Sequence, residues 1–278
     1  PASAGRSRGQ FGCTGTIGGT ESMSNKTNGA QELLSSPWIR TGTEACWETV
    51  LSLATMREYR KNETIIQAGQ TLEALGLLKS GVAKTVAVDA AGHEKIIWFM
   101  ESGCVLGETP LLNEKPCAYY FQAVERCQVY WFSKEVLFGI LLPRYPEINK
   151  ALLSIMARKI HILSTQTEEQ AFLKPLVRVA KVIYLFYANK KETGWKEYPS
   201  LPVSQEEIAN LLGLHRVTVN QALQSLRIQG VLENNTHRII VRDLERLRRA
   251  ASQDLALTHG GTVCFPDGKT GIAVSDGE

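Results

Sequence analysis

The chain of 278 residues is long enough for two ordinary domains, and its 44% hydrophobic and 21% charged residues are typical of a globular protein with a packed core. A net charge of +3 excludes a surface that is basic throughout, but it allows a local basic patch that binds nucleic acid. No apolar run is long enough for a membrane-spanning helix, and the opening residues lack the apolar centre of a secretory signal, so we expect a cytoplasmic protein.

The six cysteines are widely spaced and form no Cys-x-x-Cys pair. This spacing argues against a zinc knuckle and against a local iron–sulfur site. We therefore expect reduced thiols, no metal and no cofactor. A redox switch between two cysteines that folding brings together is the alternative.

The N-terminal part of the chain is predicted to be a disordered segment followed by an all-β domain. Residues 1–31 are rich in Gly, Ser, Thr and Asn, and residues 1–22 are expected to precede a natural start at Met23. Residues 32–142 contain strand-like runs separated by glycine turns: ETIIQAGQ, LGLLKSGVAKTVAVDAAGHEKIIWFM and CQVYWFS. Short strands at this spacing predict a β-roll or sandwich.

Residues 143–174 are predicted to form one long helix with more apolar surface than a single core face needs. Its main apolar stripe consists of Ile148, Leu152, Ile155 and Ile162. Further apolar residues widen this stripe: Leu153, Met156, Ile160 and Leu163. The near-heptad spacing favours a dimer seam over an ordinary buried helix. Lys174-Pro175 ends the helix and provides a hinge.

Residues 175–251 are predicted to form a winged helix-turn-helix domain, and residues 252–278 a disordered tail. After a helix over LVRVAKVIYLFYANK, Ser204 and Glu207 form a capping-box pattern and Gly213 ends a short helix. RVTVNQALQSLRIQ follows after a tight turn, with Val219, Leu223 and Leu226 expected to face inward. GVLENNTHRIIVRD is typical of a β-hairpin wing.

The outward side chains of the second helix match what DNA recognition requires. Arginine suits guanine or phosphate, asparagine and glutamine suit adenine, and apolar groups suit the thymine methyl. We expect the wing to add positive charge near phosphate. The candidate DNA-binding residues are Ser204, Gln205, His215, Arg216, Val217, Thr218, Asn220, Gln221, His237 and Arg238. A solvated helix in an ordinary αα-hairpin is the alternative.

This order of elements resembles the CRP/FNR family of bacterial transcription regulators. LLKSGVAKTVAVDAAGHEKI is similar to the family's β-roll core, VLGETPLL to its effector loop, and SQEEIANLLGLHRVTVNQALQSLRIQGVLE to its recognition segment. The resemblance covers residues 45–250 and implies an α+β fold with a β-roll, a long dimerisation helix and a winged helix-turn-helix. It also implies a homodimer that reads a palindrome, an effector in the β-roll, and RNA polymerase as a partner. Activation is the expectation, although the sequence does not distinguish it from repression.

Two departures from the family pattern bear on the effector and the target. Members that bind cyclic nucleotides carry an Arg-Ser pair about ten residues after the loop glutamate, whereas no arginine lies here between Glu108 and Arg126. Cyclic AMP is therefore not expected to bind well. Many members present a glutamate and, four residues later, an arginine on the recognition helix, where this chain has Val217 and Gln221. The His-x-Val-Thr-Val run and the EKIIWF segment are similar to the CprK-type regulators, which sense halophenols in organohalide respiration.

Aromatic runs and lysines suggest an aromatic or phenolic effector, because such ligands need apolar walls and a few polar anchors. The candidate effector-binding residues are Trp98, Glu108, Lys115, Tyr119, Tyr120 and Lys159, with Lys95 as a further possible cation. The aromatic residues could equally be ordinary core residues.

Three functional readings remain open. A ligand-switched DNA-binding regulator is favoured, with a cyclic-AMP-dependent regulator as an alternative within that class. A sensor module that acts through protein contacts alone would have no use for a winged helix. No enzyme is expected, because the sequence contains no nucleophile–base pair and no phosphate-binding loop.

Overall fold

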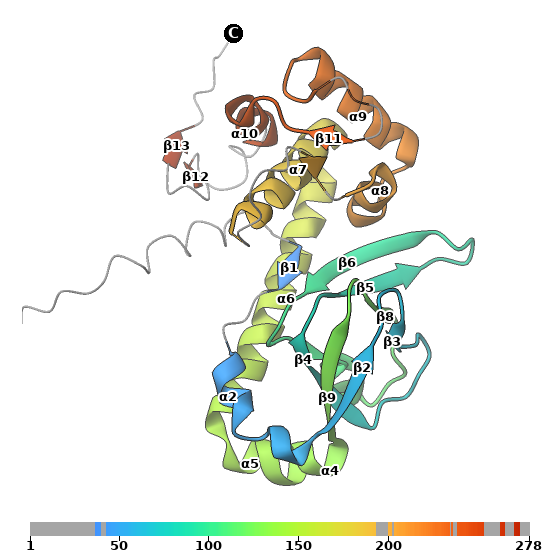
Figure 1. The fold of residues 1–278 in the computed structure, drawn as a ribbon, viewed down its shortest axis with the longest axis vertical. Coiled ribbons are helices and arrows are strands. Elements are labelled where there is room, and N and C mark those ends of the chain that lie inside the picture. The colour runs from blue at the N-terminus through green and yellow to red at the C-terminus, as the bar shows by residue number, and fades with distance from the viewer. Residues whose placement is uncertain are drawn as a thin grey trace, which may run out of the picture.

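The computed structural model describes residues 37–39, 43–192, 200–201, 203–233, 235, 238–252, 262–264 and 270–272. Figure 1 shows a β domain, a long helix that runs beside it, and a mostly helical C-terminal domain. This is the α+β fold that the sequence predicts. In the described part of the chain, no helix combines the length and the apolar character needed to cross a membrane.

The β domain consists of two facing sheets. One sheet has the strand order β1-β6-β5-β8-β3, and the other has the order β2-β9-β4-β7. The strands are β1 (Trp38–Ile39), β2 (Thr55–Tyr59), β3 (Thr64–Ile66), β4 (Ala74–Ser80), β5 (Ala83–Val88), β6 (Glu94–Met100), β7 (Val105–Leu106), β8 (Tyr120–Ala123) and β9 (Cys127–Ser133). Neighbouring strands are antiparallel except for β1, which pairs parallel to β6.

The glycine turns that the sequence marks are present between these strands. Gly81 joins β4 to β5 with φ +88°, and a Cβ there would lie 2.4 Å from the Arg126 carbonyl oxygen. Only glycine fits this position. The sequence did not predict β2, because its residues are mostly exposed and polar and so give no alternating pattern.

A bulge in β6 changes which of its side chains face each of two hydrophobic cores. Thr85 pairs with Trp98 and Val86 pairs with Ile96, so Ile97 is an extra residue. Trp98 and Met100, beyond the bulge, belong to the core inside the β domain. Ile96 before the bulge and Phe99 after it belong to a second core that the β domain shares with the C-terminal domain. The β domain and the C-terminal domain are therefore packed together through β6.

Short helices flank the strands. They are α2 (Glu44–Glu48), η1 (Leu51–Leu53), α3 (Glu108–Asn113), α4 (Lys134–Val136), the π-helical turn η2 (Leu137–Leu141) and α5 (Leu142–Arg144). Leu137 and Leu141 are buried in the first core, which anchors this end of the domain.

Helix α6 (Pro146–Phe172) has two apolar faces. The predicted seam stripe of Ile148, Leu152, Ile155 and Ile162 packs into the core of its own β domain. The prediction that this stripe forms the dimer seam is therefore wrong. The large apolar residues of α6 that remain exposed are Leu153, Ile160, Leu163 and Phe172.

The C-terminal domain contains α7 (Pro175–Glu192), β10 (Ser200–Leu201), α8 (Gln205–Leu212), α9 (Arg216–Ile228), β11 (Ile239–Ile240) and α10 (Leu244–Ser252). Its core includes Val219, Leu223 and Leu226 from α9, all fully buried as predicted. Burying a side chain of this size contributes roughly 1.5–3 kcal/mol. The sequence missed α10, whose Leu247 packs into the same core.

The wing is a small sheet. Leu232 bridges to Val241, and β11 pairs with β10, a strand that the sequence did not predict. In the C-terminal segment expected to be disordered, β12 (Thr262–Cys264) pairs antiparallel with β13 (Thr270–Ile272). That segment therefore contains a short hairpin. The predicted N-terminal disorder over residues 1–31 lies outside the described residues.

Candidate nucleic-acid interface and effector site

Helix α8 begins at a complete capping box. The Ser204 hydroxyl accepts a hydrogen bond from the Glu207 amide at 3.1 Å, and the Glu207 carboxylate accepts one from the Ser204 amide at 2.8 Å. Gly213 ends the helix in the left-handed region, with φ +62°. The chain then turns through Leu214 and enters α9 at Arg216. This gives the helix–turn–helix that the sequence predicts.

The first two turns of α9 present the predicted base-reading side chains to the outside. His215, Arg216, Val217 and Gln221 are exposed, and Thr218 and Asn220 are half-buried. Val217 is 68% exposed, and its methyl groups suit contact with a thymine methyl.

A groove joins the start of α8, the start of α9 and the wing. It is lined by Val203, Ser204, Gln205, Glu206, Arg216, Arg238 and Ile239. Arg216 and Arg238 supply positive charge to the groove, and the N-terminus of α8 adds the positive end of its dipole. Of the predicted wing residues, Arg238 is exposed and its amide is held by the Asn235 side chain at 3.0 Å, whereas His237 lies outside the described residues.

Sequence reasoning missed Glu206 in this groove. Its carboxylate lies 3.9 Å from Arg216 Nη1, and both side chains are exposed. An exposed pair of this kind contributes little to stability, about 1 kcal/mol at most. Glu206 and Arg216 are ten positions apart on different helices, so no local spacing rule could have indicated the contact.

A buried polar cluster lies between the β domain and α6. Lys159 Nζ lies 2.6 Å from Glu108 Oε1 and 3.3 Å from the Val105 carbonyl oxygen, and it sits over the Trp98 ring at 5.4 Å. The Lys159 and Glu108 side chains are only 6% and 4% exposed. Glu108 reaches this position because Gly107 turns the chain with φ +80°, where a Cβ would collide with Leu72.

Two polar atoms of this cluster have no hydrogen-bond partner in the structure. They are Glu108 Oε2, an acceptor, and Trp98 Nε1, a donor. Buried polar atoms are nearly always paired, so each is a candidate contact for a ligand. The three residues thus provide a cation, an acceptor, an indole donor and an aromatic face within one site.

The structure places the other predicted effector residues elsewhere. Tyr120 packs against the second core, and its hydroxyl donates to Glu94 at 2.6 Å. Lys115 and Tyr119 are exposed. Lys95, the further candidate cation, contacts the main-chain oxygen of Leu211 in α8. The structure therefore brings together Trp98, Glu108 and Lys159 but not the remaining members of the predicted set.

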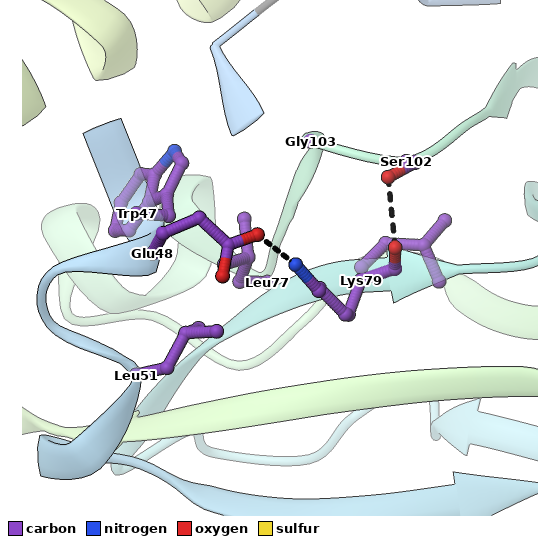
Figure 2. A pocket seen from close by; sticks show the side chains of 8 residues that line it. Trp47, Glu48, Leu51, Leu77, Lys79, Ser102 and Gly103 are labelled. Carbon is purple, nitrogen blue, oxygen red and sulfur yellow. Dashed lines mark hydrogen bonds and ion pairs between the residues drawn. The ribbon is translucent and has the colours of Figure 1, made fainter. Parts of the chain in front are cut away.

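A small hollow, shown in Figure 2, lies beside β4 and is lined by Trp47, Glu48, Leu51, Leu77, Leu78, Lys79, Ser102 and Gly103. Glu48 and Lys79 form an ion pair across it, and the Ser102 hydroxyl donates to the Lys79 carbonyl at 2.8 Å. Its free space of about 10 Å³ is roughly that of one water molecule, which is too small for an organic effector.

Cys104 and Cys127 are poor candidates for redox chemistry. Burial raises the pKa of Cys104 to about 12 and that of Cys127 to about 11, so both thiols stay protonated near neutral pH. Cys104 donates to the Ile39 carbonyl at 3.0 Å and Cys127 to the Val82 carbonyl at 3.2 Å. Cys46, Cys104, Cys117 and Cys127 are all free thiols, whereas Cys13 lies outside the described residues.

Comparison with protein-family models gives two matches, one on each side of α6. Residues 56–142 match the cyclic nucleotide-binding domain, and residues 177–250 match the Crp-like helix-turn-helix domain. The chain belongs to the CRP/FNR family of transcription regulators. Its architecture is that of a ligand-responsive, DNA-binding regulator, and the family is one of regulators rather than enzymes.

Individual relatives agree with this assignment. The cAMP-activated global transcriptional regulator CRP of Salmonella typhimurium is 25% identical over 200 residues, which are 72% of this chain and 95% of that protein. A CRP-like cAMP-activated global transcriptional regulator of Mycobacterium tuberculosis is 25% identical over 195 residues, which are 70% of this chain and 87% of that protein.

Solved structures share the fold. CLP, a c-di-GMP responsive global regulator of Xanthomonas campestris, matches with TM-score 0.64 at 20% identity over 72% of this chain and 99% of that one. OCPA-complexed CprK matches with TM-score 0.59 at 21% identity over 77% of this chain and 97% of that one.

Proposed function

We propose that this CRP/FNR-family regulator acts as a homodimer that reads an A·T-rich inverted repeat through α9. The observation that carries the proposal is the set of exposed side chains over the first two turns of α9, next to a groove with two arginines. Ser204, Gln205 and Arg238 would hold the phosphate backbone, and Val217, Thr218, Asn220 and Gln221 would reach the bases. Arg216 could serve either purpose.

Binding to duplex DNA across a range of salt concentrations tests the DNA part of the proposal. Each phosphate contact that a basic side chain makes releases counterions, so a DNA-binding protein loses affinity steeply as salt rises. A sensor module that works only through protein contacts would show weak binding with a shallow slope. A shallow slope would therefore restore that alternative.

We propose that the second copy docks on the exposed apolar face of α6. Leu153 and Ile160 are seven residues apart, as are Met156 and Leu163, and this is the heptad spacing of a two-helix seam. Leu153 and Ile160 are 67% and 63% exposed, although large apolar side chains are normally buried. A hollow beside Ile160, Leu163 and Phe172 continues this face.

We propose that the effector is a small aromatic acid or phenol that binds at Trp98, Glu108 and Lys159. An anionic oxygen would bind Lys159, a ring would stack on Trp98, and a donor on the ligand would satisfy Glu108 Oε2. The fold likeness to OCPA-complexed CprK and the sequence likeness to CprK-type regulators support this class. The roles of Lys115, Tyr119 and Tyr120 stay predictions.

A thermal-shift screen tests the effector class. A ligand that binds only the folded state raises the melting temperature by mass action. Phenols and aromatic acids should raise it in the wild type and fail to do so in Lys159→Met. Stabilisation that is unchanged in Lys159→Met would place the ligand elsewhere.

Cyclic AMP is the second candidate effector, because the cyclic nucleotide-binding model matches and the relatives of CRP type are cAMP-activated. The residues around Glu108 argue against it. Arg126 is 75% exposed and pairs with Glu58 at 2.5 Å, so the cation that Glu108 meets is Lys159. Calorimetry should show weak binding of cyclic AMP, and micromolar affinity would establish this candidate instead.

A transcription regulator binds at promoters, where RNA polymerase also binds. We therefore propose RNA polymerase as a partner and the cytoplasm as the place of action, with activation as the expected outcome. Transcription in vitro from a promoter that carries the selected site would show whether the protein activates or represses.

A further inference from the structure

Lys95 on β6 contacts the end of α8, which lies in the helix-turn-helix. Its ammonium group donates to the main-chain oxygen of Leu211 and, at 3.2 Å, to that of Ile96 in its own strand. Its Cδ lies 3.4 Å from the position that a Cβ on Gly213 would occupy. The side chain is therefore packed against the turn that separates α8 from α9.

A second cation reaches the same helix end. Arg178 of α7 is 7% exposed and donates to the Leu212 carbonyl. The last carbonyls of a helix have no partners within the helix and carry the negative end of its dipole, so cations placed there are stabilising. The β domain and α7 thus hold the C-terminus of α8 from two sides.

The same strand contacts the proposed effector site a few residues further along. Gln166 of α6 donates at 2.9 Å to the carbonyl of Ile97, the bulged residue, and Trp98 lies beneath Lys159. Two residues therefore separate the side chain that contacts α8 from the one that forms a wall of the site. β6 is hydrogen-bonded to β5 on both sides of the bulge, and β1 pairs with it just beyond Trp98, at Phe99 and Met100.

We propose that Lys95 is a positioning residue that couples the Trp98–Glu108–Lys159 site to the helix-turn-helix by holding the C-terminus of α8 to β6. The coupling rests on the proposed effector site. A change in the packing of Trp98 shifts β6, and Lys95 transmits the shift to α8 and to the turn that orients α9. Lys95 and Arg178 donate to adjacent carbonyls, so a shift of β6 moves the end of α8 relative to α7.

A mutational cycle tests the coupling without an effector. The perturbation at the site is Glu108→Gln together with Lys159→Met, which removes both charges at once and avoids a lone buried charge. It is introduced into the wild type, into Lys95→Met and into Lys61→Met, an exposed lysine of the same domain that serves as the matched control. The readout is the dissociation constant for the selected operator duplex at one fixed salt concentration.

Coupled residues give non-additive effects, and distant independent ones give additive effects. We expect the Glu108/Lys159 perturbation to change the dissociation constant by about fivefold or more in the wild type and in Lys61→Met, and by less than about twofold in Lys95→Met. An equal change in all three backgrounds, or no change in any of them, overturns the proposal. Neither result affects DNA binding itself, which the salt titration tests separately.

Amide hydrogen exchange provides a second measurement in case the perturbed site does not fold. In Lys95→Met alone, the amides of α8 and of Leu214 should exchange about fivefold or more faster than in Lys61→Met, with the β domain core unchanged. Exchange in α8 that is unchanged, or that rises equally throughout the chain, overturns the positioning role.

Discussion

Side chains on the DNA-facing surface contribute according to the part of the duplex they touch. A side chain that bonds a base edge contributes to one base pair, whereas one that bonds a phosphate contributes to every sequence alike. Gln221 lies on the exposed face of α9 and Arg238 lies on the wing beside the groove. Replacing each in turn should therefore produce different kinds of loss.

We expect Gln221→Ala to cost about 1–3 kcal/mol at one base pair and to leave preferences at the other positions unchanged. Arg238→Ala should weaken all sequences alike and reduce the steepness of the salt dependence. Competition binding against a set of single-base variants of the operator measures both. Uniform weakening by Gln221→Ala would mean that this residue faces the backbone.

The Lys159–Glu108 pair is expected to behave as a unit in folding. Lys159→Met leaves the Glu108 carboxylate buried without its cation, so we expect a loss of about 3–5 kcal/mol in the free energy of unfolding. Adding Glu108→Gln should recover most of the loss, because no buried charge then remains. Urea titration measures both variants, and equal losses in the single and double variants would contradict the account.

The Lys95 contact should depend on pH. The pKa of Lys95 is lowered from 10.5 to about 8, chiefly by burial and also by the nearby Arg178, while Glu169 acts in the opposite direction. When α8 is released, Lys95 enters water and its pKa returns toward 10.5, so the released state binds the proton more tightly. Raising the pH from 7 to 9 should therefore increase the ratio of held to released α8 by about tenfold.

Hydrogen-exchange protection of α8, corrected for the intrinsic effect of pH, measures that ratio. Protection should rise with pH in the wild type and stay level in Lys95→Met. Protection that falls as the pH rises, or a rise that persists in Lys95→Met, would show that the Lys95 contact does not control the position of α8.

The spacing of apolar residues in α6 predicts that the segment is a helix, but it does not predict which face of the helix is buried. The spacing predicted a long helix, and α6 runs from Pro146 to Phe172. Because apolar residues cover two faces, the pattern could not show which face packs inside. The structure shows that Leu152 and Ile155 belong to the core of the β domain, while Leu153 and Ile160 are exposed.

Leu153→Lys combined with Ile160→Lys should yield a folded monomer with weakened DNA binding, because two charges would be buried in the seam. Sedimentation measures the oligomeric state. Ser154→Lys combined with His161→Lys adds the same charge to exposed positions of the same helix and should leave the dimer intact. A dimer that survives the first pair of changes would place the interface on another surface.

For β6 too, the sequence predicts the element but not which side chains face each core. Its sequence is strand-like, but the bulge at Ile97 reverses the alternation, and nothing local in EKIIWFM marks it. The sequence therefore predicted that Trp98 and Tyr120 share a site, whereas Tyr120 packs on the other core. By contrast, the capping box at Ser204 and the stop at Gly213 are local rules, and both were predicted correctly.

At the scale of the whole molecule, the two family domains are joined by a shared core as well as by the chain. Val86, Ile96 and Phe99 of the β domain pack with α7, α8 and α9 residues, including Val179 and Ile208. Contacts between segments this far apart cannot be predicted from one sequence, because no spacing rule relates them. The order of the domains could be predicted, because each has its own local pattern.

We expect two copies of α9, one from each protomer, to read an A·T-rich inverted repeat. Two-fold symmetry places the half-sites about one helical turn, roughly 10 bp, apart. Val217 cannot accept a hydrogen bond from cytosine as a glutamate could, so a TTA-like half-site is expected rather than a TGTGA-like one.

Selection of binding sites from random duplex DNA tests this claim most directly, with Gln221→Ala selected in parallel. We expect an inverted repeat rich in A·T for the wild type, and a relaxed base preference at one position of each half-site for the variant. A G·C-rich consensus, a site without two-fold symmetry, or a consensus unchanged by Gln221→Ala would contradict it.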